Sequence, residues 1–235
     1  HIIGAIYLLP SLLLYFVSED LKFALLLEGY SFLESLKNIW FPSAEFLNEG
    51  GLFRPIVSTI NLIDYSLWGT NAFGYHLTNA VVHLVNIQLV YHFSLRLFKR
   101  VDISFLCSVI FLLHPILANS VYWISGRTDM VACSFYLTSL MMADKYLRGM
   151  DVKYFILSQA SFLAALLSKE ISVTLPLAQV WLILYHRCIL ERDISLKPII
   201  TRFISSSAFV VALFLIYRLI IFDKNPFMID DIYNI

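Results

Sequence analysis

Two adjacent carboxylates, Glu19 and Asp20, follow the first long apolar stretch of the chain. Neighbouring side chains point in different directions, so one carboxylate can meet a substrate while the other makes a supporting contact. A carboxylate beside a half-buried cavity and close to cations is suited to act as a general base. An acidic pair at a helix end is also a common solvated cap, and both interpretations stay open here.

Three basic residues have positions that suit an anion, and most directly a phosphate. Arg54 precedes a proline, Arg127 follows a Ser-Gly pair, and Lys169 lies between two apolar stretches. Arginine can bind phosphate through two parallel hydrogen bonds, and lysine binds it as a point charge. Two alternatives remain: the side chains reach lipid headgroups, or they form salt bridges with the nearby Asp129 and Glu170 and hold helix ends together.

Four polar residues recur at the spacing of one helix face: His76, Asn79, His83 and Asn86. Residues three and four apart lie on the same side of a helix. This stripe would be destabilising against lipid, so we expect it to face other helices or a wet cavity, and interhelical hydrogen bonding explains it without any chemistry. A metal site is not expected, because two turns separate the histidines and no third ligand is evident.

The composition indicates that these residues are positioned by membrane helices. The chain has 235 residues, of which 59% are hydrophobic and 14% charged, and its mean hydropathy is +0.76. Soluble domains are about 45–50% apolar and about 25% charged. Apolar stretches of the length a bilayer needs, about 20 residues, occur at 2–17, 77–97, 103–123, 129–147, 154–168, 171–189 and 199–222. We therefore predict an all-α, polytopic transmembrane helix bundle of about seven spans, forming a single membrane module over residues 1–235.

Charge placement predicts the orientation of the bundle. Basic residues gather around 96–100, 145–153 and 187–202, and such clusters mark the cytoplasmic side. The long first loop, residues 18–76, is then extracytoplasmic, and its amphipathic stretches 21–27 and 32–40 are expected to lie on the membrane surface. The candidate residues converge at this extracytoplasmic end, where we expect a cavity lined by His76, Asn79, His83, His114, Asp129 and Glu170. With 17 basic and 17 acidic residues, no net charge indicates nucleic-acid binding.

The order of several short motifs resembles the GT-C superfamily of membrane glycosyltransferases. The resemblance is closest to the protein O-mannosyltransferase-like group, which includes the transmembrane and tetratricopeptide-repeat proteins and their bacterial relatives. The matching stretches are Phe53-Arg54-Pro55, Leu62 to Asn71, Phe73 to Asn79, His114-Pro115, Val121 to Asp129, and Ser168-Lys169-Glu170 leading to Thr174-Leu175-Pro176. The resemblance implies the N-terminal part of a GT-C-type catalytic region.

The resemblance implies a transferase that moves a mannose-like sugar from a polyisoprenyl-phosphate carrier, dolichyl or undecaprenyl, to an acceptor hydroxyl on a protein or glycan. Such enzymes are multi-pass proteins of the bacterial inner membrane or the endoplasmic reticulum, with an extracytoplasmic site. In these enzymes an acidic residue after the first span acts as the general base, and this residue corresponds to Asp20 or Glu19. Members of the group often have Asp-Asp or Asp-Glu there, so the order Glu-Asp departs from the usual pattern. Of the two residues, Asp20 is favoured. The basic residue before proline, Arg54, corresponds to a phosphate ligand, helped by Lys169 or Arg127.

A lipid-linked donor also agrees with what the sequence lacks. It contains no glycine-rich phosphate loop or dinucleotide-binding motif, and an extracytoplasmic site has no access to cytosolic nucleotide sugars. A carboxylate base needs no metal, although some members of the group bind a divalent ion. The main alternative is a non-catalytic membrane subunit, or a lipid-carrier-binding protein, that keeps the same fold.

Overall fold

The computed structural model describes residues 8–17, 20, 25–42, 53–190 and 195–223, and this part of the chain is helical without strands. The elements in order are η1 (Leu9–Leu13), α3 (Phe32–Trp40), α5 (Pro55–Trp68), α6 (Ala72–Phe98), α7 (Val101–Leu113), η2 (Pro115–Leu117), α8 (Ala118–Tyr122), η3 (Ile124–Gly126), α9 (Arg127–Gly149), α10 (Val152–Ser168), η4 (Glu170–Thr174), α11 (Leu175–Cys188) and α12 (Leu196–Asp223). The prediction of an all-α fold is confirmed.

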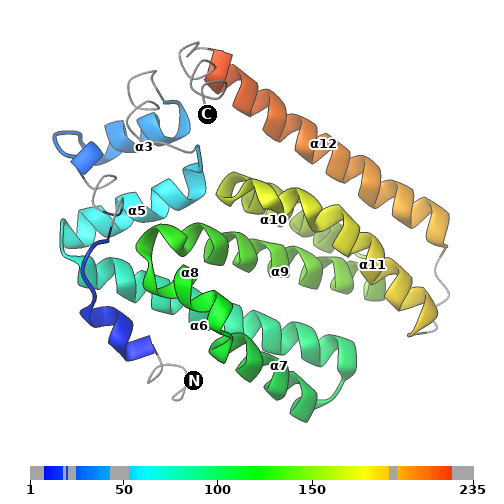
Figure 1. Ribbon diagram of the computed structural model, residues 1–235. Coiled ribbons are helices and arrows are strands. Elements are labelled where there is room, and N and C mark those ends of the chain that lie inside the picture. Colours follow the sequence, from blue (N-terminus) through cyan, green and yellow to red (C-terminus); the bar gives the residue numbers. More distant parts are fainter. Residues whose placement is uncertain (1–7, 18–19, 21–24, 43–52, 191–194, 224–235) are drawn as a thin grey trace, which may run out of the picture.

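The long helices lie side by side, and the shorter helices α3 and α5 cover one end of them (Figure 1). Helix α9 packs against both α10 and α6, while α12 packs against α10 and α11. Helices α6 and α9 begin at the end that carries α5, and α7 and α10 finish there (Figure 1). We call this the α5 end. It brings the connections around residues 54, 114, 127 and 169 to the same side of the bundle.

The predicted number of seven spans is not confirmed in the described part of the chain. Helices α6 and α12 are long and apolar enough to cross a membrane, and α7 together with residues 115–122 is a third candidate. Helices α10 and α11 have 17 and 14 residues, fewer than the roughly 20 that a bilayer core requires. Of the stretch 2–17, the described part begins with the helical residue Leu8 and the short helix η1, after which the backbone is extended at Leu14.

The stretch 103–123, which we predicted as one span, is broken in the middle. Helix α7 ends at Leu113, and the next helical segment is inclined to it by 48°. The break falls at His114-Pro115, where His114 has extended backbone angles. Proline has no backbone N–H and disfavours a helical conformation in the residue before it, so the local sequence accounts for the bend.

The interior of the bundle contains a neutral polar network that joins four helices. Ser139 of α9 and Ser158 of α10 each donate a hydrogen bond to the other's backbone carbonyl, at 2.8 and 2.9 Å. Gln179 of α11 donates to both hydroxyl oxygens at 3.2 Å. Ser207 of α12 lies 3.3 Å from the amide oxygens of Gln159 and Gln179. All five side chains are buried.

An ion cluster lies at the end of the bundle opposite to α5. The carboxylate of Asp144 has no exposed surface and accepts hydrogen bonds from Arg96 at 2.5 Å and Arg148 at 2.9 Å. His186 approaches the same carboxylate at 2.9 Å. These contacts tie α6, α9 and α11 together. The basic clusters of this end were expected to mark the cytoplasmic side, and two of their members, Arg96 and Arg148, bind this buried carboxylate.

Candidate functional site

Asp20 is buried at the α5 end, with 5% of its surface exposed. Its Oδ1 accepts hydrogen bonds from the backbone N–H and the hydroxyl of Ser125, at 2.9 and 2.7 Å, and its Oδ2 accepts one from the Val17 N–H at 3.1 Å. A carboxylate oxygen accepts about two hydrogen bonds, so Oδ2 keeps capacity for a proton. Glu19, the other predicted base, lies outside the described residues.

Arg127, two residues after Ser125, is fully buried beside the contact between Asp20 and Ser125. Its Nη1 lies 2.6 Å from Asp64 Oδ2 and donates to Asn61 at 2.7 Å; its Nε donates to Asn79 at 2.7 Å, and its Nη2 to the Tyr75 carbonyl at 2.8 Å. The guanidinium thus joins α5, α6 and α9. We predicted that Arg127 binds a phosphate. Its guanidinium group instead contacts protein groups and holds α5 and α6 against α9.

Glycine is required just before Arg127 because the backbone approaches closely there. A Cβ atom on Gly126 would lie 2.8 Å from Ser120 Cα and 2.9 Å from the Asn119 carbonyl oxygen. This close approach lets η3 turn into α9 and presents Ser125 to Asp20.

The predicted polar stripe of α6 faces the interior, as its spacing indicated. His76, Asn79, His83 and Asn86 are each at most 1% exposed. The Asn79 amide donates to two carbonyls at the end of α8, both at 3.3 Å, and the Asn86 amide donates to the Met130 carbonyl at 2.8 Å. Interhelical hydrogen bonding therefore accounts for both asparagines.

His114 was expected to line the same cavity, but it is exposed at the bend after α7. Its Nδ1 accepts a hydrogen bond from the Ile116 N–H at 3.3 Å, so it caps the following turn η2. The proline after His114 fixes this local structure and turns the ring away from the interior. The position of His114 in the motif His114-Pro115 gave no indication that its side chain is exposed.

A second cluster at the α5 end contains the other predicted cations. Arg54 Nη2 lies 3.3 Å from one carboxylate oxygen of Glu170, and Arg218 Nη1 of α12 lies 3.2 Å from the other. Lys169 pairs with Asp129 at 2.5 Å. The salt bridges considered as an alternative are therefore present. The pairing of Arg218 with Glu170 could not be predicted from the sequence, because nothing in the sequence showed that α12 returns to the loop before α5.

The electrostatic surroundings keep Glu170 ionised. Partial burial raises the pKa of its carboxyl group, but the hydrogen bond from its own backbone N–H and the charges of Arg54 and Arg218 outweigh burial. The pKa of Glu170 is consequently lower than the usual 4.5. A carboxylate that bridges two guanidinium groups is thus a stable arrangement near neutral pH.

Helix α5 connects the two clusters. Arg54 immediately precedes this helix, whereas Asn61 and Asp64 on it contact Arg127. Seven residues of helix correspond to about 10 Å, which is the axial separation of Arg54 and Asn61 along α5. Sequence analysis did not identify Asp64 and Asn61 as residues of the site. Asp64 stands in one of the matching motifs and is only 3% exposed.

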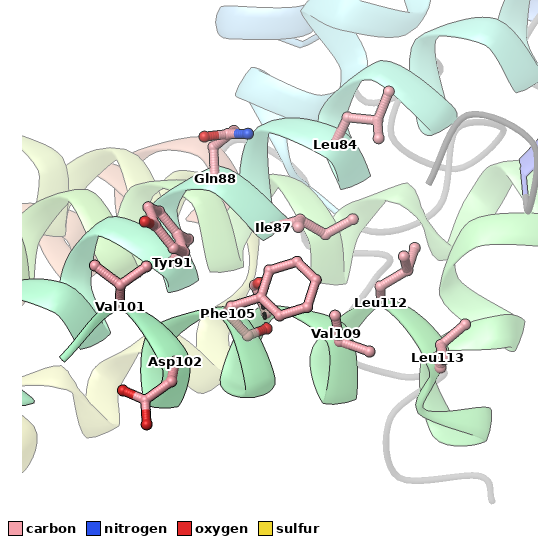
Figure 2. Close-up of a pocket in the computed structure, with 11 residues that line it drawn as sticks. Leu84, Ile87, Gln88, Tyr91, Val101, Asp102, Phe105, Val109, Leu112 and Leu113 are labelled. Atoms are coloured by element: carbon pink, nitrogen blue, oxygen red, sulfur yellow. Dashed lines mark hydrogen bonds between the residues drawn. The ribbon is translucent and has the colours of Figure 1, made fainter. Parts of the chain in front are cut away.

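Neither Asp20 nor Arg54 lines either of two cavities in the described structure. The larger, about 1060 Å³, is an apolar groove between α6 and α7, where Ile87, Phe105 and Leu112 face one another (Figure 2). It lies across the bundle from α12 (Figure 1). The smaller, about 260 Å³, includes Asp129 and Cys133. Among the described residues, no group of His, Cys, Asp and Glu has the arrangement of a metal site.

Sequence comparison identifies relatives among the protein O-mannosyl-transferases. One of Caenorhabditis elegans is 28% identical over 155 residues, which are 64% of this chain and 22% of that protein. Protein O-mannosyl-transferase TMTC1 of Homo sapiens is 30% identical over 136 residues, 52% of this chain and 15% of that protein. Tmtc1 of Drosophila melanogaster is 28% identical over 124 residues, 53% of this chain and 14% of that protein.

The chain thus spans less than a quarter of the length of these relatives. No family model and no solved structure matches it. The relatives nevertheless agree with the resemblance found in the motifs around Arg54, Arg127 and Lys169. Over part of its length, the chain is similar to protein O-mannosyl-transferases.

Proposed function

We propose that this chain is part of a membrane glycosyltransferase that moves a mannose-like sugar from a polyisoprenyl-phosphate donor to a protein or glycan hydroxyl. The observation that carries the proposal is that an acidic group, Asp20, and the cations Arg54 and Lys169 lie at the same end of the bundle. The printed names of the relatives, O-mannosyl-transferases, support the type of transfer.

The chemistry assigned to these residues is an inverting displacement. Oδ2 of Asp20 takes the proton of the acceptor hydroxyl while its oxygen attacks the anomeric carbon of the sugar. The bond between that carbon and the phosphate oxygen breaks, and its electron pair leaves with the lipid phosphate. Arg54 and Lys169 stabilise the negative charge that develops. Ser125 occupies Oδ1 and fixes the orientation of the carboxylate, and Arg127 positions α5 against α6 and α9.

A lipid-linked donor fits the surroundings of this site. The α5 end lies where the apolar helix α6 begins and where α12 finishes, so a donor held in a bilayer meets it at the membrane boundary. We place the protein, as a multi-pass one, in the bacterial inner membrane or the endoplasmic reticulum. The α5 end is extracytoplasmic, because the opposite end carries the basic clusters.

The test is sugar transfer by the full-length protein after replacement of each candidate base. Asp20→Asn and Glu19→Gln are assayed in membranes with a radiolabelled polyisoprenyl-phosphate mannose and a peptide acceptor, and Asp102→Asn is the matched control. Asp102 is an exposed carboxylate near the opposite end of the bundle. We expect one of the first two variants to lose transfer and the control to keep it. Transfer that survives in both variants would refute the assignment of the base.

The alternative, a non-catalytic subunit or lipid-carrier-binding protein with this fold, also has an observation in its favour. Asp20, Arg127, Lys169 and Glu170 all have protein partners, as residues with structural roles do. This alternative predicts that the full-length wild-type protein binds a polyisoprenyl phosphate but transfers no sugar from any polyisoprenyl-phosphate donor.

A further inference from the structure

The groove of about 1060 Å³ between α6 and α7 contains none of the candidate residues of the α5 end. It runs along α7 from Val101 to Leu113, and the rise of an α-helix makes this stretch about 18 Å long. One leaflet is half of the bilayer core, or about 15 Å. The groove therefore has about the length of one leaflet, so a lipid chain that enters at the membrane surface can follow it to its far end.

The walls of the groove and the surface beside it are apolar. Ile87, Phe105 and Leu112 face one another across the groove (Figure 2), and the neighbouring Val85 is exposed. Helix α6 is a candidate membrane span, and α7 forms part of another. This surface consequently suits hydrocarbon, and the concave part of it offers a single chain more packing contacts than a flat helix face does.

One end of the groove carries charged and polar side chains. Asp102 and Tyr91 lie at this end, and Leu113 lies at the other (Figure 2). Arg100 Nε donates a hydrogen bond to Asp102 Oδ1 at 3.2 Å, and these two side chains are 63% and 64% exposed. An exposed ion pair contributes little to stability, so its two partners can turn toward a ligand at small cost. The groove thus ends in one cation and one anion at the surface.

We infer that this groove binds a phospholipid with a primary ammonium in its head group, which is the chemistry of phosphatidylethanolamine. An acyl chain lies between α6 and α7, the ammonium donates hydrogen bonds to Asp102, and the phosphate accepts them from Arg100. The site does not depend on the proposed function. The candidate residues for sugar transfer lie at the α5 end, whereas α7 begins at the opposite end, so the two lipids would occupy different leaflets.

The pair of opposite charges determines the class of head group. An anionic head group without a cation, such as that of phosphatidylglycerol, brings a phosphate beside Asp102 and offers this carboxylate no positive charge. A choline head group has the positive charge but no N–H, so it cannot donate a hydrogen bond to Asp102. A primary ammonium has three donors. We therefore expect the order of binding to place phosphatidylethanolamine before the other two lipids.

The test is competition among these three lipids, with identical acyl chains, for the purified full-length protein in detergent, measured by native mass spectrometry. We expect the wild type to retain phosphatidylethanolamine at least about threefold better than the others, as an exposed charge pair allows. Asp102→Asn should remove this preference, and Asp102→Lys should reverse it in favour of phosphatidylglycerol. Asp151→Asn is the matched control, because Asp151 is an exposed carboxylate outside the groove, and it should keep the preference.

A second pair of variants tests the position of the acyl chain. Ile87→Trp fills the groove, whereas Val85→Trp adds the same side chain to the exposed surface beside it. We expect Ile87→Trp to retain at least about threefold less phosphatidylethanolamine than Val85→Trp, through lost packing contacts. The head-group variants leave the groove unchanged, so they test the inference even where Ile87→Trp impairs folding.

Several outcomes would overturn the inference. Equal retention of the three lipids by the wild type, or a preference that survives Asp102→Lys, would exclude the head group. Equal retention by Ile87→Trp and Val85→Trp would exclude the groove. Displacement of the phospholipid by undecaprenyl phosphate would assign the groove to the sugar carrier, and a dimer that only Ile87→Trp separates would assign it to a second copy. Asp102→Asn should keep sugar transfer while it loses the lipid preference, which distinguishes this site from the one at the α5 end.

Discussion

The ion pair between Arg127 and Asp64 gives the strongest prediction for stability. Arg127→Met removes a fully buried guanidinium and leaves Asp64, whose side chain is 4% exposed, with the hydroxyl of Thr78 as a donor at 2.6 Å. Breaking a buried pair in this way costs about 3–5 kcal/mol. Total stabilities of folded domains are about 5–15 kcal/mol, so this single change should remove a large part of the free energy of unfolding.

A double-mutant cycle separates the ion pair from the other contacts of Arg127. Asp64→Leu combined with Arg127→Met removes both charges, so the double variant should be less destabilised than the sum of the single variants. Recovery remains incomplete because Asn61 and Asn79 still lose the donor that their amide oxygens accept from.

The measurement is denaturant unfolding of the full-length protein in mixed micelles, followed by circular dichroism. Lys153→Met is the control, since Lys153 forms an exposed ion pair with Asp151, and it should not change the free energy of unfolding. The reasoning fails if Arg127→Met costs less than about 1 kcal/mol, or if the two single effects add within about 0.5 kcal/mol.

Three further predictions concern other contacts of the bundle. Asn86→Leu removes the amide that joins α6 to the Met130 carbonyl, and should cost about 1 kcal/mol in the same unfolding assay. Gly126→Ala places a Cβ 2.8 Å from the Ser120 backbone, and should cost about 1–3 kcal/mol and lower sugar transfer. Because the pKa of Glu170 is below its ordinary 4.5, its ion pairs stabilise the protein above that pH and are lost as the pH falls through the lowered value. The melting temperature should accordingly drop more from about pH 5 to about pH 3 in the wild type than in Glu170→Gln; equal drops would contradict this.

Helical periodicity predicted the parts of the structure that depend on one element alone. The spacing of His76, Asn79, His83 and Asn86 was enough to show that this face of α6 is buried, because a single helix places these residues in line. The stretch 32–40 likewise forms the helix α3. The all-helical fold class and its apolar character follow from the composition and its long apolar stretches.

Contacts between distant elements could not be predicted from spacing. Arg127 was assigned to a ligand because the sequence did not show that Asp64 and Asn61 would face it from α5. The contact between Arg218 and Glu170 likewise depends on α12 lying beside Glu170, which no spacing in the sequence shows. Hydropathy predicted about seven spans, of which two or three are confirmed as candidates in the described residues, and it did not show that the stretch 103–123 bends at Pro115.

The serine and glutamine network inside the bundle limits how the helices can slide past one another. The hydroxyl and amide groups of Ser139, Ser158 and Gln179 meet at one level along the bundle axis. An axial shift of α10 against α9 by one helical turn, about 5.4 Å, would place these polar groups opposite apolar side chains. Rearrangements of this protein are therefore expected to be rotations or tilts of whole helices, with the middle of the bundle as the fixed point.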